Sequence, residues 1–68
     1  MAGRNHGEDI ITRMILLTRN LEEGKGVNAP YIVATFGVSR NTAVRDLTRL
    51  ECSLPVIRER GVLRLMRP

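Results

Sequence analysis

Residues Thr35 to Leu50 have the sequence TFGVSRNTAVRDLTRL, and this segment is the most informative about the fold. In it, Gly37 separates two patterns that are each typical of a helix. Glycine adopts without steric penalty the left-handed backbone conformation in which a helix can end. Val38 places an apolar side chain inside the turn, where it can pack against a core, and Ser39 can cap the free amides of the next helix. These residues predict a helix-turn-helix, in which two helices are joined by a short turn.

The two helices that flank the turn are predicted from apolar side chains at helical spacing. The first runs over residues 28–36, with Asn28 as its N-cap. The second runs from Arg40 to about Cys52 and stops before Pro55, which cannot continue a helix. The inward-facing side chains are expected to be Ile32, Val33 and Phe36 in the first helix, and Ala43, Leu47 and Leu50 in the second.

A further helix is predicted upstream, opening at Glu8 and Asp9 and ending before Gly24 and Gly26. Its apolar face is expected to contain Ile10, Met14, Leu17 and Leu21, with Ile11 and Ile15 widening the stripe. Residues 1–7 have no such periodicity and include two glycines, so we expect them to form a flexible tail.

The last part of the chain changes from helical spacing to alternation. Leu63 and Leu65 fall on one face and Arg64 on the other, which predicts two short strands around a turn at Glu59-Arg60-Gly61. The fold is therefore expected to be α+β and mainly α, with three helices followed by a two-stranded hairpin. A chain of this size forms one domain, here over residues 8–68.

Charge is concentrated in the second half of the chain. The net charge is +4, and residues 1–39 carry four basic and four acidic side chains, whereas residues 40–68 carry seven basic and three acidic ones. Ten of the eleven basic residues are arginine, whose planar fork suits phosphates and guanine edges. This distribution is typical of a nucleic-acid-binding surface. Ordinary solvation, or a genome rich in arginine codons, is the alternative explanation.

A helical wheel of residues 40–52 places polar side chains opposite the inward face. The outward arc contains Asn41, Arg45, Thr48 and Cys52, flanked by Thr42 and Arg49. This pattern predicts a recognition helix, about Ser39–Cys52, in the major groove of DNA. Arg45 is the candidate for a bidentate contact with guanine and Asn41 for a contact with adenine. The candidates for phosphate contacts are Ser39, Arg40, Thr42 and Arg49. For each of them the alternative is an ordinary solvated position.

The sequence also argues against several classes of protein. Its single cysteine, Cys52, cannot form an internal disulfide or a cysteine-based metal cage, and it indicates a reducing, cytoplasmic setting. No apolar run approaches the roughly 20 residues of a membrane span. The sequence has one histidine, His6, and lacks both a Ser/His/Asp constellation and a phosphate-binding glycine loop. These features argue against an enzyme. No cofactor and no metal are therefore expected.

The segment Val27–Glu51 resembles the helix-turn-helix of DeoR-type bacterial transcription regulators. The likeness rests on Gly37-Val38-Ser39-Arg40, on Thr42, and on the runs Arg45-Asp46-Leu47 and Arg49-Leu50-Glu51. The segment Leu54–Leu65 resembles the wing of biotin-repressor-like and WYL-associated domains. Both likenesses together cover about residues 10–66 and imply a winged helix-turn-helix. They imply that three wing arginines lie against the DNA backbone or minor groove, namely Arg58, Arg60 and Arg64.

The sequence departs from the pattern of that family at three points. Pro30 and Tyr31 stand where an acidic pair is common. Ala43 is smaller than the usual branched residue, and Val44 is apolar where the family is often polar. Regulators of that family normally carry a C-terminal ligand-binding domain, whereas this sequence stops at Pro68, so we expect either a complete minimal regulator or an excised domain. No small-molecule effector is expected within this chain.

The resemblance implies a sequence-specific transcription regulator that binds double-stranded DNA and acts by promoter occupancy. A repressor or autoregulator of the phage or mobile-element kind is expected, associated with the nucleoid of a bacterial or phage-infected cell. It is expected to bind a palindromic site as a homodimer, through the upstream helix with its Arg13 and Arg19 outer face, or through Val44. The alternatives are an excisionase-like architectural DNA-binding protein and a winged-helix module for an acidic protein partner.

Overall fold

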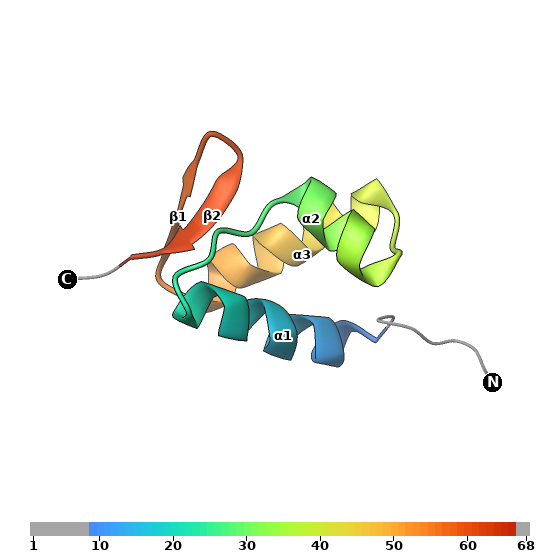
Figure 1. The fold of residues 1–68 in the computed structure, drawn as a ribbon, viewed down its shortest axis with the longest axis horizontal. Coiled ribbons are helices and arrows are strands. Elements are labelled where there is room, and N and C mark those ends of the chain that lie inside the picture. Colours follow the sequence, from blue (N-terminus) through green and yellow to red (C-terminus); the bar gives the residue numbers. More distant parts are fainter. Residues whose placement is uncertain (1–8, 67–68) are drawn as a thin grey trace.

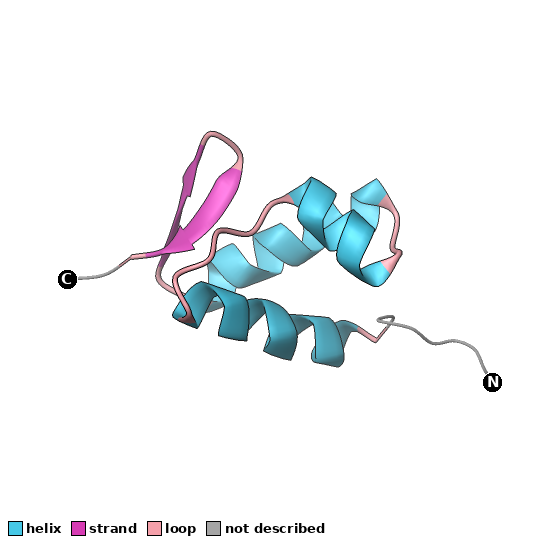
Figure 2. Ribbon diagram, in the orientation of Figure 1, coloured by secondary structure: helices cyan, strands magenta, loops and turns pink. Residues whose placement is uncertain are grey.

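The computed structural model describes residues 9–66, in which three helices are followed by an antiparallel hairpin (Figure 1 and Figure 2). The elements are α1 (Ile10–Glu22), α2 (Ala29–Phe36), α3 (Arg40–Ser53), β1 (Val56–Glu59) and β2 (Val62–Leu65). The predicted α+β, mainly helical architecture of a winged helix-turn-helix is confirmed. The expected tail, residues 1–7, lies outside the described residues.

The turn between α2 and α3 has the geometry that the sequence predicts. Gly37 has a φ of 70°, in the left-handed region, and its N–H donates to the carbonyl of Val33 at 2.9 Å. Ser39 caps α3, because its hydroxyl accepts from the amide of Thr42 at 3.1 Å. Val38 is half-buried and packs against the core. The chain therefore leaves the helical conformation at Gly37 and resumes it directly under the Ser39 cap.

Local hydrogen bonds hold both ends of α1. Asp9 is the N-cap and its carboxylate accepts a backbone amide of the first turn at 3.0 Å, so the helix begins after Asp9 rather than at it. At the other end, Gly24 has a φ of 86°. The amide of Gly24 donates to Leu21 at 3.0 Å and the amide of Lys25 donates to Asn20 at 2.9 Å. This pair of bonds is a Schellman motif, which satisfies carbonyls left open at a helix end.

The expectation that Ile11 and Ile15 widen the apolar face of α1 is wrong. Their side chains are 69% and 55% exposed. The buried face follows Leu17 and Leu21, and the position one turn before Leu17 is Arg13, which is also buried. Residues four apart lie on the same side of a helix. An ion-paired arginine therefore occupies the core-facing position, and the two isoleucines are rotated out of it.

The core lies where the three helices meet the inner side of the hairpin. Every helix and β2 contribute fully or nearly fully buried side chains, which include Leu17, Leu21, Ile32, Ala43, Leu47, Leu50 and Leu63. Figure 1 shows the hairpin at one end of the molecule, beside the C-terminal part of α3, and the α2–α3 turn at the other end. The helix-turn-helix and the wing are thus fixed to a common core.

A backbone link between the wing and the helices is not predicted by the sequence. Val27, in the connection between α1 and α2, forms a single antiparallel bridge with Leu63 of β2. The amide of Val27 donates to the carbonyl of Leu63 at 3.0 Å, and the reverse bond is 2.7 Å long. Both side chains are fully buried. The bridge therefore joins the wing to the segment that leads into α2.

The turn of the hairpin is tighter than predicted. Glu59 belongs to β1 and pairs with Val62, so only Arg60 and Gly61 form the turn. Both residues have a positive φ, 55° and 78°, as a two-residue hairpin turn of type I′ requires. The predicted alternation in β2 is confirmed by buried Leu63, half-buried Leu65 and exposed Arg64.

Candidate nucleic-acid interface

α3 has one buried face and one open face, as the helical wheel predicts. The side chains turned to the core are Ala43, Asp46, Leu47 and Leu50. The exposed side chains on the opposite side are Asn41, Arg45, Thr48 and Cys52. The helix therefore presents an amide, a guanidinium and a hydroxyl in one strip. These groups can hydrogen-bond to the edges of bases.

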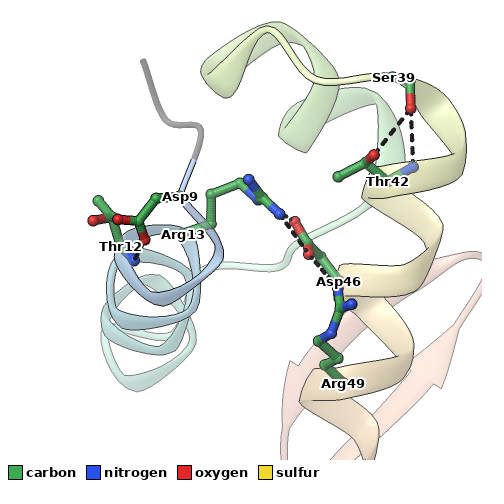
Figure 3. A network of polar contacts seen from close by, with 7 residues as sticks. All are labelled: Asp9, Thr12, Arg13, Ser39, Thr42, Asp46 and Arg49. Atoms are coloured by element: carbon green, nitrogen blue, oxygen red, sulfur yellow. Dashed lines mark hydrogen bonds and ion pairs between the residues drawn. The ribbon is translucent and has the colours of Figure 1, made fainter. Parts of the chain in front are cut away.

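The hydroxyl groups on α3 make hydrogen bonds within the helix. Ser39 donates to Oγ1 of Thr42 at 3.1 Å and also accepts from the Thr42 amide (Figure 3). The Thr48 hydroxyl donates to the carbonyl of Val44 at 3.2 Å. Because Ser39 already donates its hydroxyl hydrogen to Thr42, the Thr42 hydroxyl is the one of these two that can still donate to an incoming phosphate.

Four of the candidate arginines have guanidinium groups without a partner in the described part of the chain. They are Arg40, Arg45, Arg60 and Arg64, and all four are exposed. Two lie on α3 and two on the wing. A guanidinium that has no carboxylate partner keeps all five donors for another acceptor.

The other two candidate arginines already bind carboxylates. Arg49 donates through Nη1 to Oδ1 of Asp46 at 3.1 Å. Arg58 donates through Nε and Nη2 to both oxygens of Glu51, at 3.1 and 2.9 Å, and so ties β1 to the last turn of α3. A guanidinium held in this way can contact a phosphate only with the N–H groups that its carboxylate leaves open.

The three wing arginines do not share one face. In the hairpin, Arg58 lies opposite Leu63 and Arg64 lies opposite Ile57. Successive positions of a strand point to opposite faces, so Arg58 is on the side of buried Leu63 and Arg64 on the outer side. Arg60 is in the turn, and together with Glu59, Val62 and Arg64 it lines an open hollow of about 550 Å³. The structure thus brings Arg60 and Arg64 together and separates Arg58 from them.

A buried ion pair beneath α3 is the feature that the sequence pattern did not predict. Arg13 of α1 donates through Nε to Oδ2 of Asp46 at 2.6 Å and through Nη2 to Oδ1 at 3.3 Å (Figure 3). The side chain of Arg13 is 6% exposed and that of Asp46 is fully buried. The expectation that Arg13 lies on the outer face of α1 is therefore wrong. A signal was present, because Arg13 lies one turn before Leu17 and Asp46 one turn before Leu50, both on core-facing stripes.

A metal-binding cluster and a membrane-spanning helix are both absent from residues 9–66. No group of three or more His, Cys, Asp or Glu side chains in this range could hold a metal ion. None of the described helices combines the length and apolar character that crossing a bilayer needs. Cys52 is a free, exposed thiol at the end of the polar strip on α3.

Comparison with known proteins agrees with this geometry. A family model described as a DeoR-like helix-turn-helix domain matches residues 13–68, which include all of α2, α3 and the wing. No curated protein and no solved structure matches the chain. Domains of this family are DNA-binding parts of transcription regulators and are not catalytic. The resemblance of Val27–Glu51 is thereby confirmed, and the chain belongs to the DeoR-like family of helix-turn-helix DNA-binding domains.

Proposed function

We propose that this chain binds double-stranded DNA in a sequence-specific manner, with α3 in the major groove, and regulates transcription by occupying a promoter. The observation that most supports this proposal is the exposed strip on α3, whose central Arg45 has no partner within residues 9–66. The opposite face of the helix is packed into the core. A helix anchored in this way fixes the backbone positions from which its exposed side chains reach the edges of bases.

The proposed roles on α3 follow from the position of each side chain. Arg45, in the middle of the strip, donates two hydrogen bonds to guanine, and Asn41, one turn earlier, pairs with adenine. Thr48, one turn later, offers its methyl group to a thymine. The side chains proposed to contact phosphates are Arg40, Thr42 and Arg49, because the Ser39 hydroxyl already donates its hydrogen to Thr42.

For the wing we propose two different roles. Arg60 and Arg64 are exposed, lie around one hollow and have no carboxylate partner in the described chain, so they are suited to neutralising DNA phosphates. Arg58 instead holds the wing against Glu51 at the end of α3. This division of roles replaces the expectation that the three arginines act alike.

We further propose that the protein acts as a repressor or autoregulator, as a homodimer on a palindromic site in a bacterial cytoplasm. A single module of this size buries about 600–1,000 Å² on DNA, so two copies on adjacent half-sites bind more tightly than one. Two surfaces are open to a second copy. One is the exposed side of α1, with Ile11 and Ile15, and the other is Val44 on α3, which is 43% exposed.

Selection from a random pool of duplexes tests this proposal. Protein-bound DNA is recovered over several rounds and sequenced, and binding to the enriched duplex is then measured by fluorescence anisotropy. We expect a motif of two inverted half-sites whose centres lie about 10 base pairs, or a multiple, apart. A bound fraction with the composition of the starting pool would contradict sequence-specific binding and favour an architectural role. A single unrepeated half-site would contradict the dimer.

A further inference from the structure

We infer that Asp46 is a positioning residue: held in place by Arg13 of α1, it orients the guanidinium of Arg49 for a contact with a DNA phosphate. The inference rests on the proposed function, in which Arg49 is one of the phosphate contacts. It adds two residues, Arg13 and Asp46, that touch no DNA themselves.

The carboxylate of Asp46 is gripped by two arginines from different helices. Oδ2 accepts from Nε of Arg13 at 2.6 Å, and Oδ1 accepts from both Nη2 of Arg13 at 3.3 Å and Nη1 of Arg49 at 3.1 Å (Figure 3). Because Arg13 binds both oxygens, the carboxylate cannot rotate without breaking an ion pair. Arg49 therefore binds a carboxylate whose orientation is fixed by Arg13 of α1.

This network reaches solvent through Arg49. The side chains of Arg13 and Asp46 are 6% and 0% exposed, whereas that of Arg49 is 44% exposed. Arg49 is therefore the one of the three side chains that lies within reach of DNA, on the flank of the polar strip of α3.

Stability alone is a weak reason for such a pair. The desolvation of two buried charges offsets most of their attraction, and apolar replacements of similar volume are often as stable or more so. Orienting Arg49 is the role that we assign to the pair, because Asp46 is hydrogen-bonded to this arginine, which would contact DNA. A hydrogen bond between ionised partners is also directional and strong.

Holding Arg49 before DNA arrives favours binding. A free arginine loses rotamer freedom when it binds a phosphate, which disfavours the complex. Arg49 has already lost part of that freedom, because its Nη1 is held by Asp46. Within residues 9–66 its other N–H groups have no partner, so they can still donate to a phosphate. Arg45 has no partner in the described residues, so Arg49 is held before DNA binds whereas Arg45 is not.

A double-mutant cycle tests the inference, with affinities for one selected duplex measured by fluorescence anisotropy. The variant Arg13→Met/Asp46→Leu replaces the buried pair with apolar side chains and leaves the net charge at +4. Arg49→Ala is introduced into the wild type and into this variant. Circular dichroism and thermal unfolding check that each protein is folded.

In the wild type, Arg49→Ala is expected to weaken binding about tenfold, the loss of one hydrogen bond between charged groups. The Arg13→Met/Asp46→Leu variant is expected to bind about as weakly as Arg49→Ala. Introducing Arg49→Ala into this variant is expected to weaken binding by less than about a further twofold, because the effects of coupled residues are not additive. Equal losses from Arg49→Ala in both backgrounds would overturn the inference, as would wild-type affinity in Arg13→Met/Asp46→Leu. A wild type that binds no duplex would instead overturn the proposed function, and the inference with it.

Arg49→Lys tests the same point without touching the core. Lysine keeps the charge but lacks the planar fork that binds a carboxylate and a phosphate at the same time. If Asp46 orients Arg49, Arg49→Lys binds the selected duplex about as weakly as Arg49→Ala. Wild-type affinity of Arg49→Lys would show that charge alone suffices and would overturn the inference.

Discussion

Glu51 and Arg58 face each other across the junction between α3 and β1, with two guanidinium donors on the two carboxylate oxygens at 3.1 and 2.9 Å. This ion pair joins the end of the candidate recognition helix to the wing through side chains. The Val27–Leu63 bridge joins the wing to the start of the helix-turn-helix through the backbone. The wing is thus fixed at two points, and Arg58 is turned toward α3 rather than toward the outer face that carries Arg64.

Arg60→Ala and Arg58→Ala form a matched pair, because each removes one positive charge from the wing. Arg60→Ala is expected to weaken binding to all duplexes and to lower the slope of log K against log salt by about 0.9, the value for one phosphate contact. Arg58→Ala is expected to leave that slope unchanged, since its guanidinium is bound to Glu51. Anisotropy titrations at several salt concentrations measure both slopes, and equal changes would contradict the two roles assigned to the wing.

Gly26→Ala is expected to destabilise the fold by about 1–3 kcal/mol, the usual result of overpacking. A Cβ at this position would lie 2.5 Å from Cγ1 of Val62 and 3.3 Å from the guanidinium carbon of Arg64. Urea denaturation of Gly26→Ala, Val62→Ala and the double variant checks the cause. The double variant should lose less unfolding free energy than the two single variants lose together, because Val62→Ala removes the atom with which the new Cβ would clash. Simple additivity would contradict the close approach.

Gly37→Ala is expected to lower the free energy of unfolding by about 1–2 kcal/mol, since an L-residue with a β-carbon is strained at a left-handed φ. No atom lies within 4 Å of the place that such a Cβ would occupy, so backbone strain alone is tested. Gly37→Asn is the control, because asparagine tolerates this conformation better than alanine does. If alanine and asparagine are equally well tolerated, the left-handed turn is not what this position requires.

Arg13→Met alone leaves the carboxylate of Asp46 buried without its two-point partner and is expected to destabilise the fold by about 3–5 kcal/mol. The Arg13→Met/Asp46→Leu variant is expected to unfold close to the wild type in urea, because both buried charges are removed together. If the double variant were as unstable as Arg13→Met, the two residues would not act as a pair in the folded protein.

The parts of the fold that the sequence predicts are those with local causes. Gly37 and Ser39 determine the turn through their own backbone and side-chain chemistry, and the spacing of leucines identifies the inward face of α3. The alternation of Leu63, Arg64 and Leu65 likewise predicts β2. These features depend on residues within a few positions of one another, which is the range over which a pattern carries information.

The features that the sequence does not predict depend on contacts between distant segments. Arg13 and Asp46 are 33 residues apart, and an ionisable residue on an apolar stripe is buried only when its partner lies on the facing stripe. The pairing of Arg58 with Glu51 similarly depends on how the wing meets α3. The signal available in this sequence is a charged residue at a core-facing position on each of two neighbouring helices, Arg13 on α1 and Asp46 on α3.

Arg45 is proposed to read a base from the exposed strip of α3, and a comparison of two affinities of Arg45→Ala tests this role. Binding is measured to the selected duplex and to random duplex, with Lys25→Ala as a control that removes the same charge from the exposed connection between α1 and α2. We predict that Arg45→Ala loses about 1–3 kcal/mol on the selected duplex and much less on random DNA, so that discrimination falls. Lys25→Ala should leave discrimination unchanged. An equal loss on both duplexes for Arg45→Ala would contradict its assignment as a base-reading residue.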